Sequence, residues 1–166
     1  LNNAGITMWA TFEETTDPEI IDKVMRTNFL SVAYCTHYAL PHLIKSKGRL
    51  VGVSSLAGIL GVPGHVIYGA SKHAVQGFLN SLRVELKPKG VSVTTICPDF
   101  VVTEIHNRGL KGDGSLMRKR LSPDKYMSAA TCAEMMVDAI ARRQRQMITS
   151  ARGRLASVVR DLFPGL

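Results

Sequence analysis

The sequence predicts an α/β fold in which a doubly wound parallel sheet carries helices on both faces. The first reason is the order of its patterns, because short segments rich in β-branched residues alternate with long helical ones. The second is the length of those helices, about twenty residues each, which suits the crossovers that parallel strands require. A length of 166 residues corresponds to about one domain, so residues 1–166 are treated as a single unit.

The first helix is expected from about residue 17 to residue 45. Asp17 can serve as its N-cap with Pro18 in the first helical position, or Thr16 and Glu19 form a capping box. Its buried face should carry residues at steps of three and four: Ile20, Val24, Asn28, Val32, Cys35 and Ala39.

The central part of the chain continues the alternation. Residues 1–5 are predicted to end a buried strand, and residues 49–54 to form the next strand. A glycine-rich loop at 58–64 leads to a second helix over 66–87, which Pro88 and Gly90 end. The β-branched segment 91–97 predicts another strand.

The last third is more polar. Residues 103–127 contain three glycines and are expected to form a mobile flap, with Leu110, Leu116 and Met117 as apolar cover and the basic run at 118–120 in solvent. Helical spacing returns over 129–140. A short edge strand at 147–149 and an amphipathic turn or two at 155–162 complete the prediction.

Positive charge is concentrated in the C-terminal third of the chain. The net charge is +8, yet residues 108–125 carry six basic and two acidic side chains, and residues 142–154 carry five arginines and no acid. Such segments form a solvated face or contact phosphate, an acidic substrate or an anionic membrane surface. Because aromatic side chains are almost absent among these charges, we expect no nucleic-acid partner.

The composition excludes other classes. The uncharged stretches 27–44 and 50–71 are interrupted by glycine, proline and polar residues, so neither is expected to span a membrane, and no signal peptide is expected. The cysteines include no C-x-x-C pair, which predicts reduced, buried thiols and no metal site: Cys35, Cys97 and Cys132.

Four polar residues form the candidate catalytic constellation. Tyr68 and Lys72 are four apart on the second helix and therefore share one face, where an ammonium group would lower the pKa of the phenol. Ser55 follows a predicted strand, at the sheet edge where ligands bind in open parallel sheets. Asn28 interrupts an apolar stripe. Taken singly, Ser55 suits a strand-end cap and Asn28 a satisfied core amide.

These residues belong to a larger pattern that resembles the short-chain dehydrogenases/reductases. Its motifs occur in that family's order and spacing over nearly the whole chain: Asn3-Ala4-Gly5, Asn28, Ser54-Ser55, Tyr68-Gly69-Ala70-Ser71-Lys72 and Pro98 with Thr103 five residues later. The resemblance implies a Rossmann-type fold and hydride transfer between NADP or NAD, with NADP slightly preferred, and an alcohol or ketone.

The resemblance also assigns roles to residues. Ser55 orients the substrate oxygen, Tyr68 is the acid/base, Lys72 holds the nicotinamide ribose, and Asn28 fixes a water in the proton relay. The residues expected to contact the cofactor are Asn3, Ala4, Gly5, Tyr68, Lys72, Pro98, Val101 and Thr103. The flap at 103–127 lies where the family places a substrate lid.

Two departures from the family pattern stand out. Asp99 replaces the usual glycine after Pro98, which could crowd or repel the cofactor or leave a carboxylate in solvent. No G-x-x-x-G-x-G phosphate loop occurs, so we expect the chain to be the C-terminal part of a Rossmann domain. These departures support one alternative, a catalytically weak cofactor-binding or regulatory protein on the same fold.

The remaining expectations concern substrate and assembly. The segments 39–43 and 54–58 and the tail are similar to the 11-beta-hydroxysteroid dehydrogenase-like branch, which implies a lipophilic, steroid- or lipid-like substrate. Both long helices carry apolar residues on more than one face, and the family pairs such helices, so a homodimer or homotetramer is expected. The location expected is cytoplasmic, with peripheral membrane association left open.

Overall fold

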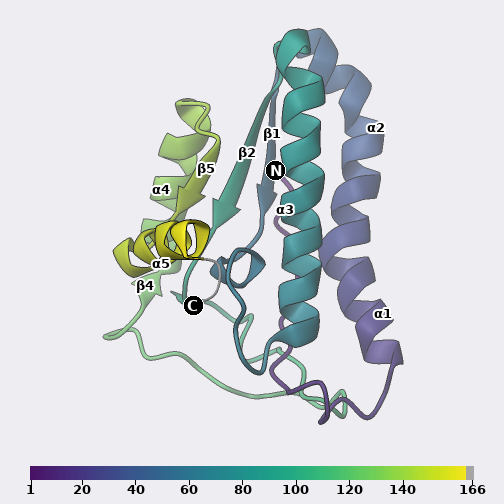
Figure 1. Ribbon diagram of the computed structural model, residues 1–166, viewed down its shortest axis with the longest axis vertical. Helices are drawn as coiled ribbons and strands as arrows, with labels where there is room; N and C mark the ends of the chain where they lie inside the picture. Colours follow the sequence, from purple (N-terminus) through teal and green to yellow (C-terminus); the bar gives the residue numbers. More distant parts are fainter. Residues whose placement is uncertain (164–166) are drawn as a thin grey trace.

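The computed structural model describes residues 1–163 and confirms the α/β class (Figure 1). Three parallel strands lie side by side in the order β1 (Arg49–Val53), β2 (Ser92–Cys97) and β5 (Gln146–Ile148). The N-terminal segment runs along β1, because Asn2 forms a parallel bridge with Gly52. The strand predicted at 1–5 is therefore present as a single bridge at the sheet edge.

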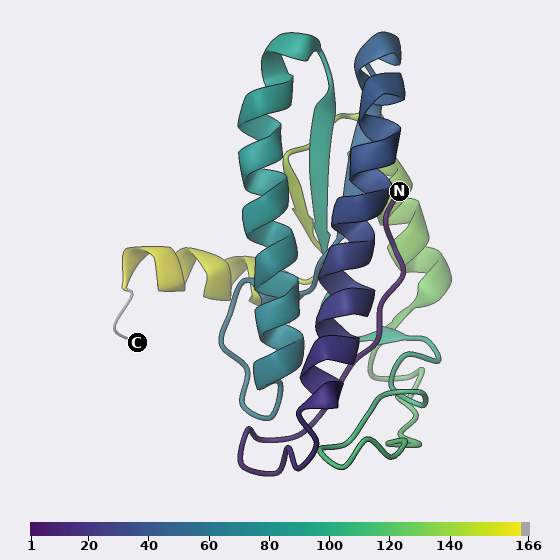
Figure 2. The ribbon, with the colours of Figure 1, turned by 90° about the vertical axis from the view of Figure 1, so that its right-hand side faces the viewer.

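Helices cover both faces of this sheet, as predicted for a doubly wound fold. On one face lie α1 (Glu19–Met25), α2 (Ser31–Ser46) and α3 (Val66–Leu86), and on the other lies α4 (Ala129–Ala141) (Figures 1 and 2). The core under α3 is built from aliphatic side chains of α2, α3, β1, β2 and the residue before β2: Val32, Leu50, Val75, Leu79, Leu86, Val91 and Val93.

The first predicted helix contains a π-helical turn, η1 (Arg26–Leu30), between α1 and α2. A π turn holds more residues than an α turn, so the buried positions continue in steps of four from Val24 through Asn28 and Val32 to Thr36. The expected face was therefore wrong beyond Val32: Cys35 is exposed, and the expectation of three buried thiols holds only for Cys97 and Cys132.

Side-chain caps set several helix ends. The carboxylate of Asp17 accepts a hydrogen bond from the backbone N–H of Glu19, which favours the first of the two expected starts. Ser128 caps α4, and Ser150 caps α5 (Ala151–Leu162) by accepting from the N–H of Gly153. Because of that cap, α5 begins four residues before the predicted amphipathic turn. It projects from the body of the molecule (Figure 2).

The loop predicted as a flap contains no helix and is closed at its base by a two-residue pairing. There β3 (Val101–Val102) lies parallel to β4 (Met127–Ser128). Leu110, expected to cover a ligand, is 5% exposed and belongs to a core cluster with Met8 and Val24. The flap is thus docked through Leu110, whereas Leu116 remains exposed.

Across residues 1–163, no helix combines the length and apolar character needed to cross a bilayer. The 3₁₀ turns η2 (Leu56–Gly58) and η3 (Lys87–Lys89) complete the elements. The carboxyl ends of β1 and β2 and the start of α3 share one end of the sheet, the end where the predicted catalytic residues lie.

Candidate active site

Ser55 and Tyr68 meet at the carboxyl end of β1. Ser55 follows that strand and accepts a hydrogen bond from the N–H of Ala57, so it caps η2 as well as facing the site. Its side chain lies close enough to the Tyr68 phenol to affect the phenol's pKa. Burial raises the pKa of Tyr68 and the nearby Ser55 side chain lowers it, with the net direction upward. This is opposite to the direction expected from Lys72, because burial dominates.

Lys72 lies one turn further along α3 and is 3% exposed. Its Nζ is 5.8 Å from the centre of the Tyr68 ring and donates a hydrogen bond of 3.0 Å to the carbonyl oxygen of Val53. Burial lowers the pKa of Lys72 to about 8. The spacing of four residues therefore brings Lys72 close to Tyr68, as predicted. The Lys72 ammonium group, which loses its proton more easily than an ordinary lysine, lies beside the phenol.

Asn28 lies in the π turn behind this group and is fully buried. Its amide exchanges hydrogen bonds with both backbone groups of Ile6, at 2.8 and 2.9 Å, and donates to the hydroxyl of Ser71 at 2.9 Å. The amide is thus satisfied by the protein, as expected for a core residue. Ser71 in turn donates to the carbonyl of Tyr68, which connects Asn28 to the start of α3.

Gly5 separates Asn28 from Lys72. A Cβ atom at this position would lie 3.2 Å from the amide oxygen of Asn28 and 3.2 Å from Nζ of Lys72. Only a residue without a side chain leaves that space open. Asn3 and Ala4 are exposed next to it. The predicted motif at residues 3–5 therefore borders the Lys72 end of the site.

The segment after β2 forms another border. The carbonyl of Pro98 accepts a hydrogen bond from the N–H of Leu56, which joins it to the segment that carries Ser55. Val101 begins β3, and Thr103 is exposed and accepts from the N–H of Ile105. The structure therefore gathers Ser55, Tyr68 and Lys72 closely and leaves Thr103 at the entrance of the flap.

Asp99 does not point freely into solvent. Both carboxylate oxygens accept hydrogen bonds from Arg152, at 2.7 and 3.0 Å, and Ser150 donates to the same group at 2.7 Å. Burial raises the pKa of Asp99, but the bonds from Arg152, Ser150 and the Phe100 N–H outweigh it, so the net shift is downward. The residue that departs from the family pattern thus anchors the start of α5.

A group of rings that no sequence pattern indicated lies beside Tyr68. The His65 ring lies 5.6 Å from that of Tyr68 and 4.5 Å from Trp9, and Phe100 lies 6.4 Å from Trp9. Lys119 of the flap, expected in solvent, sits 4.0 Å above the Trp9 ring. The available signals were His65, three residues before Tyr68, and a single tryptophan shortly after a predicted strand.

Two histidines in this region are held neutral. Burial lowers the pKa of His65 and of His106, and the nearby charge of Lys119 lowers both further. His65 Nδ1 is 2.8 Å from the carbonyl of Met8, whereas His106 Nδ1 is buried without a hydrogen-bond partner among the described residues. The site therefore offers an unsatisfied polar atom close to an aromatic surface.

Comparisons with known proteins identify the family. A family model described as short chain dehydrogenase matches residues 1–112. The "11-beta-hydroxysteroid dehydrogenase-like 4A" of Arabidopsis thaliana is 37% identical over 142 residues, covering 86% of this chain and 46% of that protein. The chain spans about half the length of the curated relatives it matches.

Solved structures give the same result. ElxO with NADP bound is 36% identical, with a TM-score of 0.59 over 62% of this chain and 42% of that one. A short chain dehydrogenase/reductase from Burkholderia phymatum in complex with NAD shares the fold, with a TM-score of 0.80, 24% identity and coverage of 97% and 64%. The chain belongs to the short-chain dehydrogenase family.

Proposed function

We propose that the full-length protein is an NAD(P)-dependent oxidoreductase that interconverts an alcohol and a ketone. The observation that carries this proposal is the grouping of buried Tyr68 with Ser55 beside its phenol and buried Lys72 one helical turn away. These groups lie at the carboxyl ends of parallel strands, where open α/β sheets bind their ligands.

The residues present suit the nicotinamide end of a dinucleotide. Gly5 leaves open a space within 3.2 Å of Nζ of Lys72, and a donor beside such a space suits a ribose hydroxyl. We assign the cofactor contacts to Lys72 and Tyr68, with borders at residues 3–5 and at Pro98, Val101 and Thr103. The bound nicotinamide would supply or accept the hydride. We propose a slight preference for NADP over NAD, because NADP is bound in the solved structure of ElxO, which is 36% identical to this chain.

The proton chemistry belongs to this chain. Ser55 would hold the substrate oxygen, and Tyr68 would donate a proton to it or remove one from it. Because burial raises the pKa of Tyr68, the phenol keeps its proton near neutrality and suits donation to a forming alkoxide. Lys72, with a pKa of about 8, is poised to resupply that proton, and Asn28, whose amide oxygen faces Lys72 across Gly5, would hold a water of the relay.

The substrate we propose is lipophilic. Trp9, His65 and Phe100 present aromatic rings next to Tyr68, and the unsatisfied nitrogen of His106 would accept or donate one hydrogen bond to a polar group. The name of the Arabidopsis relative points to the same substrate class. We propose that the flap at 103–127 acts as the lid over this surface, held through Lys119.

The structure weakens the argument for a regulatory protein that lacks activity. That alternative relied on Asp99 and on the absence of a phosphate loop from the sequence. The carboxylate of Asp99 is neutralised by Arg152 and turned toward α5, which removes the first of these two supports. The cofactor side therefore does not face an unpaired negative charge from this residue.

The test is Tyr68→Phe in the full-length protein, measured as the rate of NADPH-dependent reduction of a lipophilic ketone. The ring remains and the ionisable oxygen is lost, so the rate should fall by about 10²-fold or more while NADPH still binds. Tyr38→Phe, on an exposed tyrosine of α2, is the matched control and should keep full activity. Near-normal turnover by Tyr68→Phe would remove Tyr68 from the mechanism, and cofactor binding without turnover in the unaltered protein would favour the regulatory alternative.

A further inference from the structure

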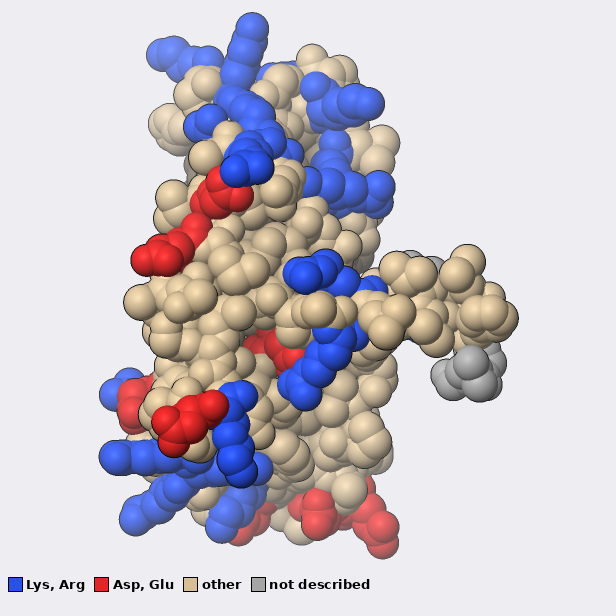
Figure 3. All heavy atoms as spheres, turned by 90° about the vertical axis from the view of Figure 1, so that its left-hand side faces the viewer, with Lys and Arg blue, Asp and Glu red and all other residues tan. Residues whose placement is uncertain are grey.

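The end of the molecule opposite Tyr68 is strongly basic. Because the strands are parallel and the helices run back against them, this end collects the amino ends of β1 and β2 and the carboxyl ends of α2, α3 and α4. Figure 3 shows Lys and Arg side chains gathered there. Cations near helix carboxyl ends are favourable, which explains a basic surface but not a concave one.

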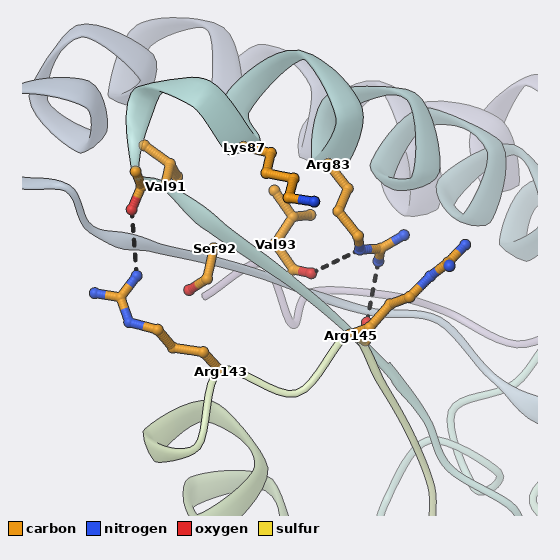
Figure 4. Close-up of a pocket in the computed structure, with 8 residues that line it drawn as sticks. Arg83, Lys87, Val91, Ser92, Val93, Arg143 and Arg145 are labelled. Atoms are coloured by element: carbon orange, nitrogen blue, oxygen red, sulfur yellow. Dashed lines mark hydrogen bonds between the residues drawn. The ribbon is translucent and has the colours of Figure 1, made fainter.

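A cavity of about 250 Å³ opens in this end, between the end of α3 and the loop that precedes β5 (Figure 4). Four of the side chains that line it are cationic, and none of the described lining residues is acidic. The cavity is smaller than a pocket for a drug-sized ligand, about 300–1,000 Å³, so it suits a small group. The cationic residues are Arg83, Lys87, Arg143 and Arg145.

Arg83 and Arg143 are fixed in place by hydrogen bonds to neutral oxygen atoms. Arg83 donates to the carbonyl of Val93 at 3.0 Å and to the hydroxyl of Thr95 at 2.9 Å. Arg143 donates to the carbonyls of Lys47 and Gly90, at 3.0 and 3.3 Å. These partners are neutral groups, so both guanidinium groups are oriented but keep their positive charge.

Lys87 and Arg145 are exposed, and neither side chain has a hydrogen bond or ion pair among the residues described. Figure 4 shows both on the Arg83 side of the cavity. Burial lowers the pKa of Arg83, and the charge of Arg145 lowers it further. In the same wall, the hydroxyl oxygen of Ser92 is buried without a hydrogen-bond partner in the described part of the chain.

We propose that this cavity binds a phosphate group, as the free ion or as a phosphate monoester. A dianion would offset the repulsion between Arg83 and Arg145, attract Lys87, and accept a hydrogen bond from Ser92. Phosphate oxygens match the donors of arginine and lysine, and charge-assisted bonds of this kind are the strong ones. The lining lacks an aromatic ring among the described residues, so a single-stranded nucleic acid is disfavoured. This inference does not depend on the proposed oxidoreductase activity.

The probe is inorganic phosphate, titrated against sodium chloride of equal ionic strength. Amide NMR shifts of residues 90–93 should report saturable phosphate binding that chloride does not reproduce, with calorimetry giving the affinity. Removing two charge-assisted contacts in Lys87→Ala/Arg145→Ala should weaken phosphate binding by about tenfold or more. Ser92→Ala, which removes one neutral donor, should weaken it by about two- to fivefold.

The matched control is Lys45→Ala/Lys89→Ala, which removes the same charge from the same end outside the cavity lining. It should change the affinity by less than about twofold, because surface charges beyond the contact are screened by salt. Phenyl phosphate and vesicles of phosphatidylcholine with or without phosphatidic acid then distinguish a soluble monoester from a lipid headgroup. Shifts equal to those in chloride, or equal losses in the control and cavity variants, would overturn the proposal.

Discussion

Lys72 is buried in an environment that disfavours its protonated, charged form. It is 3% exposed, its one hydrogen-bond partner in the described structure is the carbonyl of Val53, and burial lowers its pKa to about 8. A lysine in the unfolded chain has a pKa of about 10.4. The difference means that the protonated residue opposes folding and that the neutral residue does not.

This difference predicts how the free energy of unfolding varies with pH. Below pH 8 both states hold the proton, and between about 8 and 10.4 the folded state releases it first, so stability rises with pH. Lys72→Met lacks this contribution. The difference in unfolding free energy between the unaltered chain and Lys72→Met should therefore shift in favour of the unaltered chain by up to about 3 kcal/mol from pH 8 to pH 10.4. Urea denaturation at a series of pH values measures it.

Comparison with a variant is essential, because Tyr68 and Cys97 have raised pKa values and act in the opposite direction as pH rises. The matched control is Lys89→Met, which replaces an exposed lysine. The unfolding free energy of this variant should change with pH in parallel with that of the unaltered chain. Parallel curves for Lys72→Met would contradict the lowered pKa.

At the residue scale, the sequence predicts local pairs better than distant ones. Tyr68 and Lys72 could be placed together because four residues of helix bring side chains to one face. The bonds of Asn28 to Ile6 and of Asp99 to Arg152 join positions far apart in the chain. They depend on how the loops and α5 dock, which no local pattern encodes. The roles assigned to the site residues stay predictions.

At the element scale, strands and helix ends were predicted within a few residues, whereas the π turn and the docking of the flap were missed. The π turn was hidden because its apolar positions mimic ordinary helical spacing. The flap was expected to be mobile because of its glycines, yet Gly112 is buried against the loop at residues 11–16. Its carbonyl accepts a hydrogen bond from the N–H of Thr16.

Gly112 is therefore a contact point, and a side chain there should undock the flap. A Cβ atom at this position would lie 2.0 Å from the carbonyl oxygen of Glu14, which is backbone and cannot rotate away. Gly112→Ala should destabilise the chain by about 1–3 kcal/mol, as overpacking does, and speed amide hydrogen exchange over residues 104–117.

The matched control for this variant is Gly61→Ala, because an added Cβ at Gly61 would meet nothing within 4 Å. It should leave the exchange of the flap unchanged and the stability within about 0.5 kcal/mol of the unaltered chain. Equal exchange rates in Gly112→Ala and Gly61→Ala would show that the flap is not held at this point.

At the scale of the whole molecule, the outer surface of α3 shows why assembly is expected. Of the apolar residues on this helix, Val75, Leu79 and Leu86 are buried against the sheet. Phe78 packs edge to face on Phe29. What remains outside is a stripe of apolar and small residues: Val66, Ala70, Gly77, Ser81 and Val84.

On this side of the sheet, α1 and α2 run beside α3 (Figure 2). Tyr38 of α2 is 77% exposed and Val84 of α3 is 76% exposed. A two-fold axis through this face would pair the exposed surface of α2 and α3 with the same surface of a second chain, which is the geometry of an isologous dimer. The candidate catalytic residues lie at the start of α3, so pairing along the helix sides leaves that end of the helix uncovered.

We therefore expect the full-length protein to form a homodimer or homotetramer through this face, and Gly77→Arg to make it monomeric. An added Cβ at Gly77 meets nothing within 4 Å, and arginine has a higher helix propensity than glycine by about 0.8 kcal/mol, so the fold of one chain should survive. A charge buried between two copies would oppose association. Val137→Arg adds the same charge on an exposed position of α4 and should keep the assembly intact. Light scattering at micromolar concentration measures the assembly. A monomeric unaltered protein would contradict the predicted oligomer, and equal association of the two variants would place the interface elsewhere.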